Sequence, residues 1–75
     1  MTNYQFTAQI EKDLETGLYI GIIPNIPGAH TQAKTLDELS KNLKEVLTLC
    51  IESMSIEELK GLPEFIGFQQ VSIAV

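Results

Sequence analysis

The sequence predicts an α+β fold with the element order β-β-β-α-β. Three observations carry this prediction: apolar and polar residues alternate near the N-terminus, one helical stripe of apolar residues fills the middle, and a second alternating segment closes the sequence. A sequence of 75 residues has the size of one domain, so we expect a single domain over residues 1–75.

The first half of the sequence predicts a hairpin. Residues 4–11 alternate between apolar and polar side chains, which is typical of a strand with one apolar face. Residues 12–17 are polar and include the turn formers Asp13 and Gly17. Residues 18–23 are apolar on both faces, a pattern typical of a central strand that is covered on both sides.

A turn and a short edge strand follow. Two prolines bound residues 24–28, and Pro27 with Gly28 suits the central positions of a type II turn. Residues 29–34 are more polar, which predicts an edge strand.

A capped helix comes next. Thr35 lies three residues before Glu38, the spacing of a capping box at a helix start, and acidic residues there favour the positive end of the helix dipole. The helix is expected to run to residue 54 or 55, with a possible further short turn capped by Ser55. Its apolar stripe consists of Leu36, Leu39, Leu43, Val46, Leu47, Cys50, Ile51 and Met54.

The last segment, residues 64–75, predicts a fourth strand. Short connections favour an antiparallel meander of the first three strands, and the helix then returns the chain to the free edge of the first. The predicted sheet is therefore mixed, with the order 3-2-1-4 and one helix packed on it.

One helix cannot cover all the apolar residues of such a sheet. The excess predicts a buried interface in a homo-oligomer, either a dimer or a tetramer. Its expected residues are Tyr19, Phe65, Ile66 and Phe68.

Charge restricts the class of partner. Ten acidic and five basic residues give a net charge of −5, and all five basic residues are lysines. Binding of nucleic acid requires basic side chains that neutralise phosphates, so we expect no direct nucleic-acid contact. An acidic surface suits a basic protein partner or simply maintains solubility.

Catalytic chemistry finds little support in the sequence. His30 is the only histidine and has no cysteine nearby in sequence, which favours a structural or surface role. Cys50 lies within the apolar helix stripe, where a buried inert thiol is the favoured interpretation. The sequence therefore predicts no enzyme, no cofactor and no metal site. An unpaired cysteine, together with the absence of a signal peptide or a long apolar run, favours the cytoplasm.

Several segments together resemble the HicB-like antitoxins. They are residues 10–13 and 17–20 of the first hairpin, the turn at residues 24–28, residues 31–39 leading into the helix, and Leu62-Pro63 before the last strand. The resemblance implies a partial RNase H-like fold and an antitoxin that neutralises a small basic HicA-like toxin. Such a toxin cleaves mRNA, and the antitoxin would cover its active and RNA-binding surface.

The sequence departs from the family pattern in two respects. Ala33 and Lys34 stand where the family commonly has glycine and aspartate before the capping threonine, which affects the expected choice of partner. The segment that follows the core in many HicB antitoxins is also missing, so we expect the core domain alone, without a C-terminal DNA-binding module.

The sequence is therefore consistent with two functions. In the first, acidic residues meet the lysines of a toxin; the candidates are Glu11, Asp13, Glu15, Asp37 and Glu38. In the alternative, the protein is a solitary oligomeric ligand-binding or assembly protein of the same fold. A metal-dependent nuclease is disfavoured, because its carboxylates would have to converge and the last predicted strand has none after Glu64.

Overall fold

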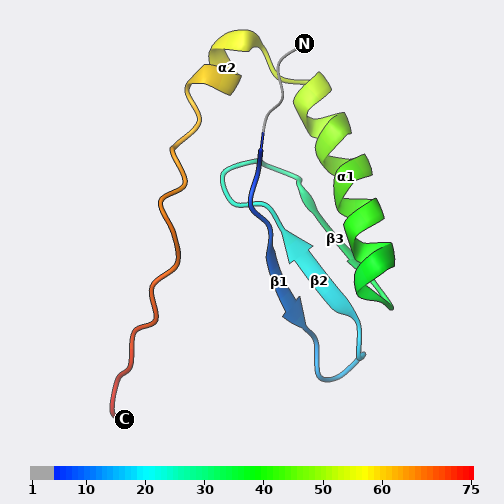
Figure 1. Cartoon of the computed structure of the whole chain (residues 1–75), viewed down its shortest axis with the longest axis vertical. Helices are drawn as coiled ribbons and strands as arrows, with labels where there is room; N and C mark the ends of the chain where they lie inside the picture. The colour runs from blue at the N-terminus through cyan, green and yellow to red at the C-terminus, as the bar shows by residue number, and fades with distance from the viewer. Residues whose placement is uncertain (1–4) are drawn as a thin grey trace.

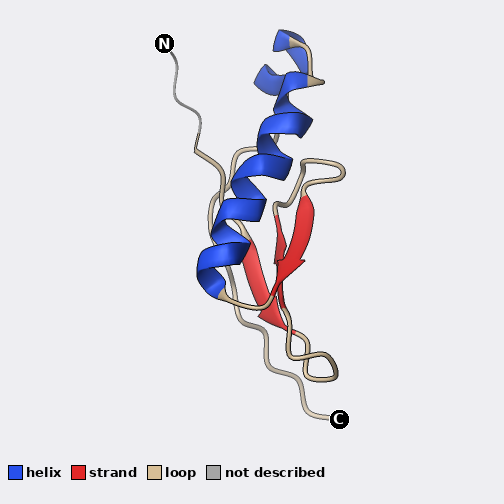
Figure 2. Ribbon diagram, turned by 90° about the vertical axis from the view of Figure 1, so that its right-hand side faces the viewer, coloured by secondary structure: helices blue, strands red, loops and turns tan. Residues whose placement is uncertain are grey.

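A three-stranded sheet with one long helix on one face forms the body of the protein (Figures 1 and 2). The computed structural model describes residues 5–75. The elements are β1 (Gln9–Lys12), β2 (Tyr19–Ile22), β3 (His30–Ala33), α1 (Leu36–Glu52) and α2 (Ile56–Lys60). The sheet is antiparallel with the order β1-β2-β3, which confirms the α+β class and the first four predicted elements.

The hairpin between β1 and β2 closes on Asp13. Its backbone N–H donates to the carbonyl of Leu18 at 2.8 Å, and its own carbonyl accepts the N–H of Gly17 at 2.7 Å. Gly17 has φ +75°, a conformation that glycine adopts without a Cβ clash. β1 is shorter than predicted because regular pairing begins at Gln9, and the predicted contribution of Tyr4 lies outside the described residues.

Two consecutive tight turns join β2 to β3. The N–H of Ile26 donates to the carbonyl of Ile23 at 3.4 Å, and the N–H of Ala29 donates to the carbonyl of Ile26 at 3.1 Å. Each turn has proline at its second position and a positive φ at its third, +70° at Asn25 and +81° at Gly28. This is the type II pattern, predicted for the second turn and found in both.

Small residues in the sheet let α1 approach closely. A Cβ placed on Gly21 would lie 2.8 Å from Leu43 Cδ1, which is inside van der Waals contact. Ala29 and Ala33 lie on the same face and are 1% and 6% exposed. Leu39 of α1 is fully buried against this face.

α1 packs on β3 and β2 and leaves the side of the sheet at β1 uncovered. Ile10 of β1 pairs with Gly21 across the ladder and therefore lies on the helix-facing side of the sheet. It is nevertheless 53% exposed. The sheet thus has a covered half and an open half on the same face.

Hydroxyl caps begin both helices. Thr35 Oγ1 accepts the N–H of Glu38 at 3.1 Å, which is the first half of the predicted capping box. At Ser55 both halves of a capping box are present: its hydroxyl accepts the N–H of Glu58, and its own N–H donates to the Glu58 carboxylate. The possible extra turn predicted after residue 55 is therefore a separate helix, α2.

The predicted fourth strand is not formed within this chain. Residues 64–75 run away from α2 as an extended segment without helix or strand, and every one of them is exposed (Figure 1). The chain leaves α2 through Gly61 and Pro63, and proline can neither continue the helix nor donate to a ladder. The observed sheet has three strands in place of the predicted four, and we call residues 64–75 the C-terminal segment.

Neither helix within residues 5–75 has the length and apolar composition needed to cross a membrane.

The burial of Leu39 predicts a large loss of stability on truncation. Leu39→Ala should lower the free energy of unfolding by about 2–5 kcal/mol, because it removes buried methyl groups and leaves a cavity. Leu49→Ala on the same helix is the matched control: Leu49 is 65% exposed, so its loss should cost less than about 0.5 kcal/mol. Urea denaturation at equal protein concentration measures both, and equal losses would contradict the packing described here.

Candidate functional site

Five acidic residues lie on two segments that reach the same end of the molecule, the β1–β2 hairpin and the start of α1. The β1–β2 turn and the start of α1 both lie at the lower end of Figure 1. The pairing of Tyr19 with Ala33 explains this proximity, because the strand that leaves the turn lies beside the strand that enters α1. We call this region the acidic end. Its carboxylates are Glu11, Asp13, Glu15, Asp37 and Glu38.

The turn holds the side chain of Asp13 in place. Its carboxylate accepts the hydroxyl of Thr16 at 2.8 Å and the backbone N–H of Glu15 at 3.2 Å. The Thr16 hydroxyl oxygen in turn accepts the N–H of Leu18 at 3.2 Å. The hydrogen bond from Thr16, followed by that from the Glu15 backbone, lowers the pKa of Asp13 below its ordinary value. The turn therefore presents a fixed negative charge.

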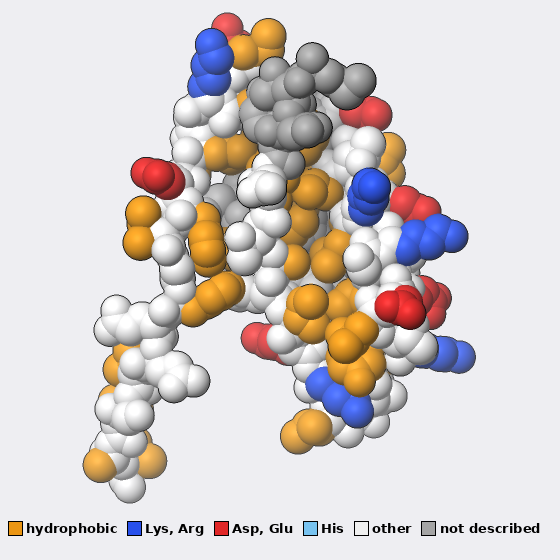
Figure 3. Space-filling model, in the orientation of Figure 1, with side chains coloured by type: hydrophobic (Ala, Val, Ile, Leu, Met, Phe, Trp, Pro, Cys, Tyr) orange, Lys and Arg blue, Asp and Glu red, His pale blue; other side chains and the backbone are white. Residues whose placement is uncertain are grey.

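Lysines lie among these carboxylates. Lys12 places its Nζ 5.4 Å from the ring centroid of Tyr19, a cation–π distance. Lys34 is exposed just before the α1 cap. Figure 3 shows blue and red side chains side by side at the lower right of the molecule. The acidic end is thus a mixed surface in which carboxylates outnumber ammonium groups.

The structure separates the predicted oligomer-interface residues. Tyr19 is half-buried at one end of β2, where it packs against the core. Phe65, Ile66 and Phe68 lie in the C-terminal segment and are 47%, 87% and 65% exposed. Phe65 borders Ile23, just beyond the other end of β2. These three residues therefore belong to the C-terminal segment, apart from Tyr19.

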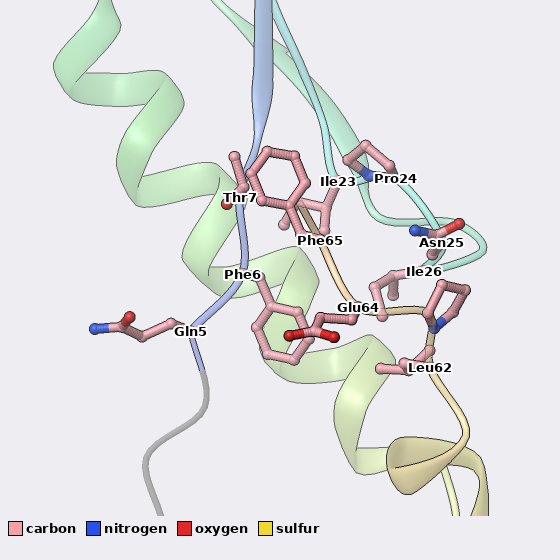
Figure 4. Close-up of a pocket in the computed structure, with 11 residues that line it drawn as sticks. Gln5, Phe6, Thr7, Ile23, Pro24, Asn25, Ile26, Leu62, Glu64 and Phe65 are labelled. Carbon is pink, nitrogen blue, oxygen red and sulfur yellow. The ribbon is translucent and has the colours of Figure 1, made fainter. Parts of the chain in front are cut away.

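A cavity of about 250 Å³ opens where the C-terminal segment leaves the body (Figure 4). The rings of Phe6 and Phe65 border it from two distant parts of the sequence. Sequence reasoning missed this cavity, because neither ring belongs to a regular element and only the path of the chain brings them together. Its lining is Gln5, Phe6, Thr7, Ile23, Pro24, Asn25, Ile26, Leu62, Pro63, Glu64 and Phe65.

The single histidine and the single cysteine have different surroundings. His30 is exposed on β3, and Cys50 is half-buried with its Sγ 3.7 Å from the carbonyl oxygen of Pro27. Among residues 5–75, no three His, Cys, Asp or Glu side chains are placed to hold a metal ion.

Three curated proteins align with nearly the whole chain. The UPF0150 protein ssr1258 of Synechocystis sp. is 41% identical over 73 residues, which cover 97% of this chain and 100% of that protein. A UPF0150 protein of Thermotoga maritima is 41% identical over 68 residues, covering 91% and 88%. One of Archaeoglobus fulgidus is 44% identical over 70 residues, covering 92% and 94%. The chain belongs to the UPF0150 family.

The comparisons place no function on this UPF0150 protein, because the names of its relatives state none. No family model matched the chain, and no solved structure matched it. The Synechocystis alignment spans 97% of the chain, so it includes most of the C-terminal segment. That segment is therefore part of the shared domain.

The hydrogen bonds of the turn predict the titration of Asp13. Thr16→Val should raise the pKa of the Asp13 carboxyl toward its ordinary value, as followed by carboxyl carbon chemical shifts in NMR. Thr48→Val is the control, because the Thr48 hydroxyl donates to the carbonyl of Lys44 on α1. Identical Asp13 titrations in the wild type and Thr16→Val would contradict the assigned cause.

The same shift has a consequence for stability. A carboxyl whose pKa is lower in the folded state stabilises the fold above its unfolded pKa, and this contribution disappears as the pH falls through the folded pKa. The loss from Asp13 should therefore occur below about pH 4. Thr16→Val should reduce this acid-dependent part of the stability.

Proposed function

We propose that this UPF0150 protein is a HicB-like antitoxin. In this proposal it binds a small basic HicA-type toxin and covers the surface with which that toxin binds and cleaves mRNA. The resemblance of residues 10–39 to HicB-like antitoxins supports the proposal, as does the β-β-β-α order of the described body.

The observation that carries the proposal is the acidic end. Acidic residues of the β1–β2 hairpin and of the first turn of α1 lie toward the same end of the body, and the chain as a whole has a net charge of −5. A protein that binds RNA must present lysines or arginines to phosphates. Carboxylates held at similar positions would compete for those cations and would steer the encounter between the two proteins.

Hydrogen bonds hold one carboxylate and one helix start in this region, which supports binding over mere solubility. The Asp13 carboxylate accepts two hydrogen bonds, and Thr35 fixes the start of α1. Groups held in place before binding lose less conformational entropy when the partner arrives. A surface needed only for solubility has no such requirement.

The proposed fold class extends beyond the observed sheet. A partial RNase H-like unit would have a fourth strand beside β1, and the C-terminal segment has the sequence pattern for it. In this proposal the fourth strand forms only when the protein is assembled.

A solitary assembly protein is the second candidate. The exposed apolar side chains of the C-terminal segment favour self-association, and that association does not require a toxin. Co-expression separates the two candidates. If a small basic protein encoded beside this gene arrests growth, and this chain does not restore growth, the antitoxin proposal fails and the assembly protein is favoured.

Charge removal at the acidic end should slow toxin binding. The test variant combines Glu11→Gln, Glu15→Gln and Asp37→Asn, which changes the formal charge from −5 to about −2 and leaves both caps intact. At low salt its association rate with the toxin should fall about tenfold, and the difference should shrink above about 0.5 M salt. Stopped-flow fluorescence measures the rate, and inhibition of mRNA cleavage measures the outcome.

The control has the same net charge with changes elsewhere. It combines Glu45→Gln, Glu52→Gln and Glu57→Gln, three exposed residues on α1 and α2 beyond the acidic end. Its association rate should stay within about twofold of the wild type, because steering depends on charges near the contact. Equal slowing by both variants would show that only net charge matters and would remove the acidic end as the binding site.

A further inference from the structure

We infer that the C-terminal segment is exchanged between two copies of this chain, each segment adding a fourth strand to the β1 edge of the other. The inference rests on three features: an open edge at β1, an unpaired segment with a strand pattern, and a geometry that carries this segment away from its own sheet. It is independent of the proposed toxin.

The backbone of β1 has hydrogen-bonding groups directed outward. The backbone N–H of Asp13 donates to the carbonyl of Leu18, so these two residues form a hydrogen-bonded pair. In an antiparallel ladder every second residue pair is hydrogen-bonded, so Glu11 and Ile20 form the next such pair. The N–H and C=O groups of Ile10 and Lys12 then point to the open edge. Such an edge is a template for a further strand.

The C-terminal segment has the pattern of the strand that this edge lacks. Val71, Ile73 and Val75 alternate with small or polar residues, and their exposed fractions are 74%, 79% and 116%. β-branched side chains in alternation favour a pleated, half-buried strand. The alternation does not stabilise a segment that is isolated and exposed. This indicates that the segment pairs with another strand in the functional form of the protein.

The open half of the sheet lacks apolar cover as well as a strand. α1 lies over β2 and β3, and Ile10 on β1 is half exposed on the helix-facing side. A strand placed beside β1 would bring its own apolar side chains next to Ile10. The uncovered apolar surface beside β1 and the exposed apolar side chains of the C-terminal segment are therefore complementary.

The segment is directed away from its own edge. Leu62 packs on the core, and Phe65 lies beside Ile23 at the cavity. The rings of Phe65 and Phe68 then meet edge to face, with centroids 5.2 Å apart. Beyond them the segment runs in the same direction as β1, and Figure 3 shows open space between its lower part and the sheet.

Exchange satisfies both copies at once. In a two-fold dimer each β1 edge receives the partner's segment, so neither a β1 edge nor a C-terminal segment is left unpaired, and both pairings are identical. This arrangement would give the order 3-2-1-4 in each sheet, with the fourth strand supplied by the partner. The connection through Gly61 and Pro63 is the hinge between the exchanged segment and the body.

The area is sufficient for a stable dimer. Residues 64–75 make up about 1.3 kDa of the 8.3 kDa chain, so the surface scaling for unfolded chains gives each segment roughly 1,900 Å². Covering about half of one segment from each copy, together with the matching surface of the receiving sheet, exceeds the roughly 1,600 Å² of a standard interface.

The test uses two full-length variants, one defective at the edge and one in the segment. Ile10→Pro removes an outward N–H, a position where an edge strand tolerates proline. Val71→Pro combined with Ile73→Pro removes donors from the segment. Light scattering after size exclusion at about 100 μM should show a dimer of two 8.3 kDa chains for the wild type and monomers for each variant. Circular dichroism checks that α1 remains folded.

Mixing supplies the deciding result. An equimolar mixture of the two variants should form a heterodimer, because one supplies an intact segment and the other an intact edge. The control for the edge variant is Ile10→Val, and the control for the segment variant combines Val71→Ile with Ile73→Val. Both controls should remain dimeric. A monomeric wild type whose Ile10 and Lys12 amides resist hydrogen exchange would show that each chain closes on itself. Proline variants that stay dimeric would show a dimer through another surface. Either result overturns the exchange.

Discussion

The packing of the helix on the sheet depends on the close approach of α1 to a row of small residues on the sheet surface. Gly21, Ala29 and Ala33 leave room on β2 and β3 for the leucines of the helix, and Leu43 fills the space that any side chain at position 21 would need. Close-packed interiors tolerate little change of volume, so these small residues determine where the helix can lie. They place the helix over β2 and β3, away from β1. The open half of the sheet follows from that placement.

Local signals in the sequence were sufficient for most of the body. Alternation predicted the first hairpin, Pro27 and Gly28 predicted the second turn, and Thr35 predicted the start of α1, since each of these depends on neighbouring residues. The first turn at Asn25 was missed because asparagine adopts positive φ only in some contexts. Local signals were not sufficient for the fourth strand. The alternation of residues 71–75 is typical of a strand, but whether that strand pairs depends on which sheet edge the chain can reach.

The sequence was sufficient to name the residues of the candidate site, but it did not predict their positions relative to one another. The hairpin carboxylates and the helix-start carboxylates were both named from the sequence, and their presence at one end follows from the pairing of Tyr19 with Ala33. The hydrogen bonds that fix Asp13 follow from the turn, which local residues determine. The cavity between Phe6 and Phe65 had no local signal, because it lies between segments almost sixty residues apart in sequence.

The unpaired backbone of residues 64–75 has a consequence for the lifetime of the protein. Proteases bind substrates as extended, accessible chain, and this segment has that form in a single copy. In the exchanged dimer the same peptide bonds would lie within a sheet and resist cleavage. Turnover would then depend on how much of the protein is present: dilute copies would be trimmed, while concentrated copies would protect one another. In the exchanged dimer, the C-terminal segment would thus couple the survival of each molecule to the abundance of its own kind.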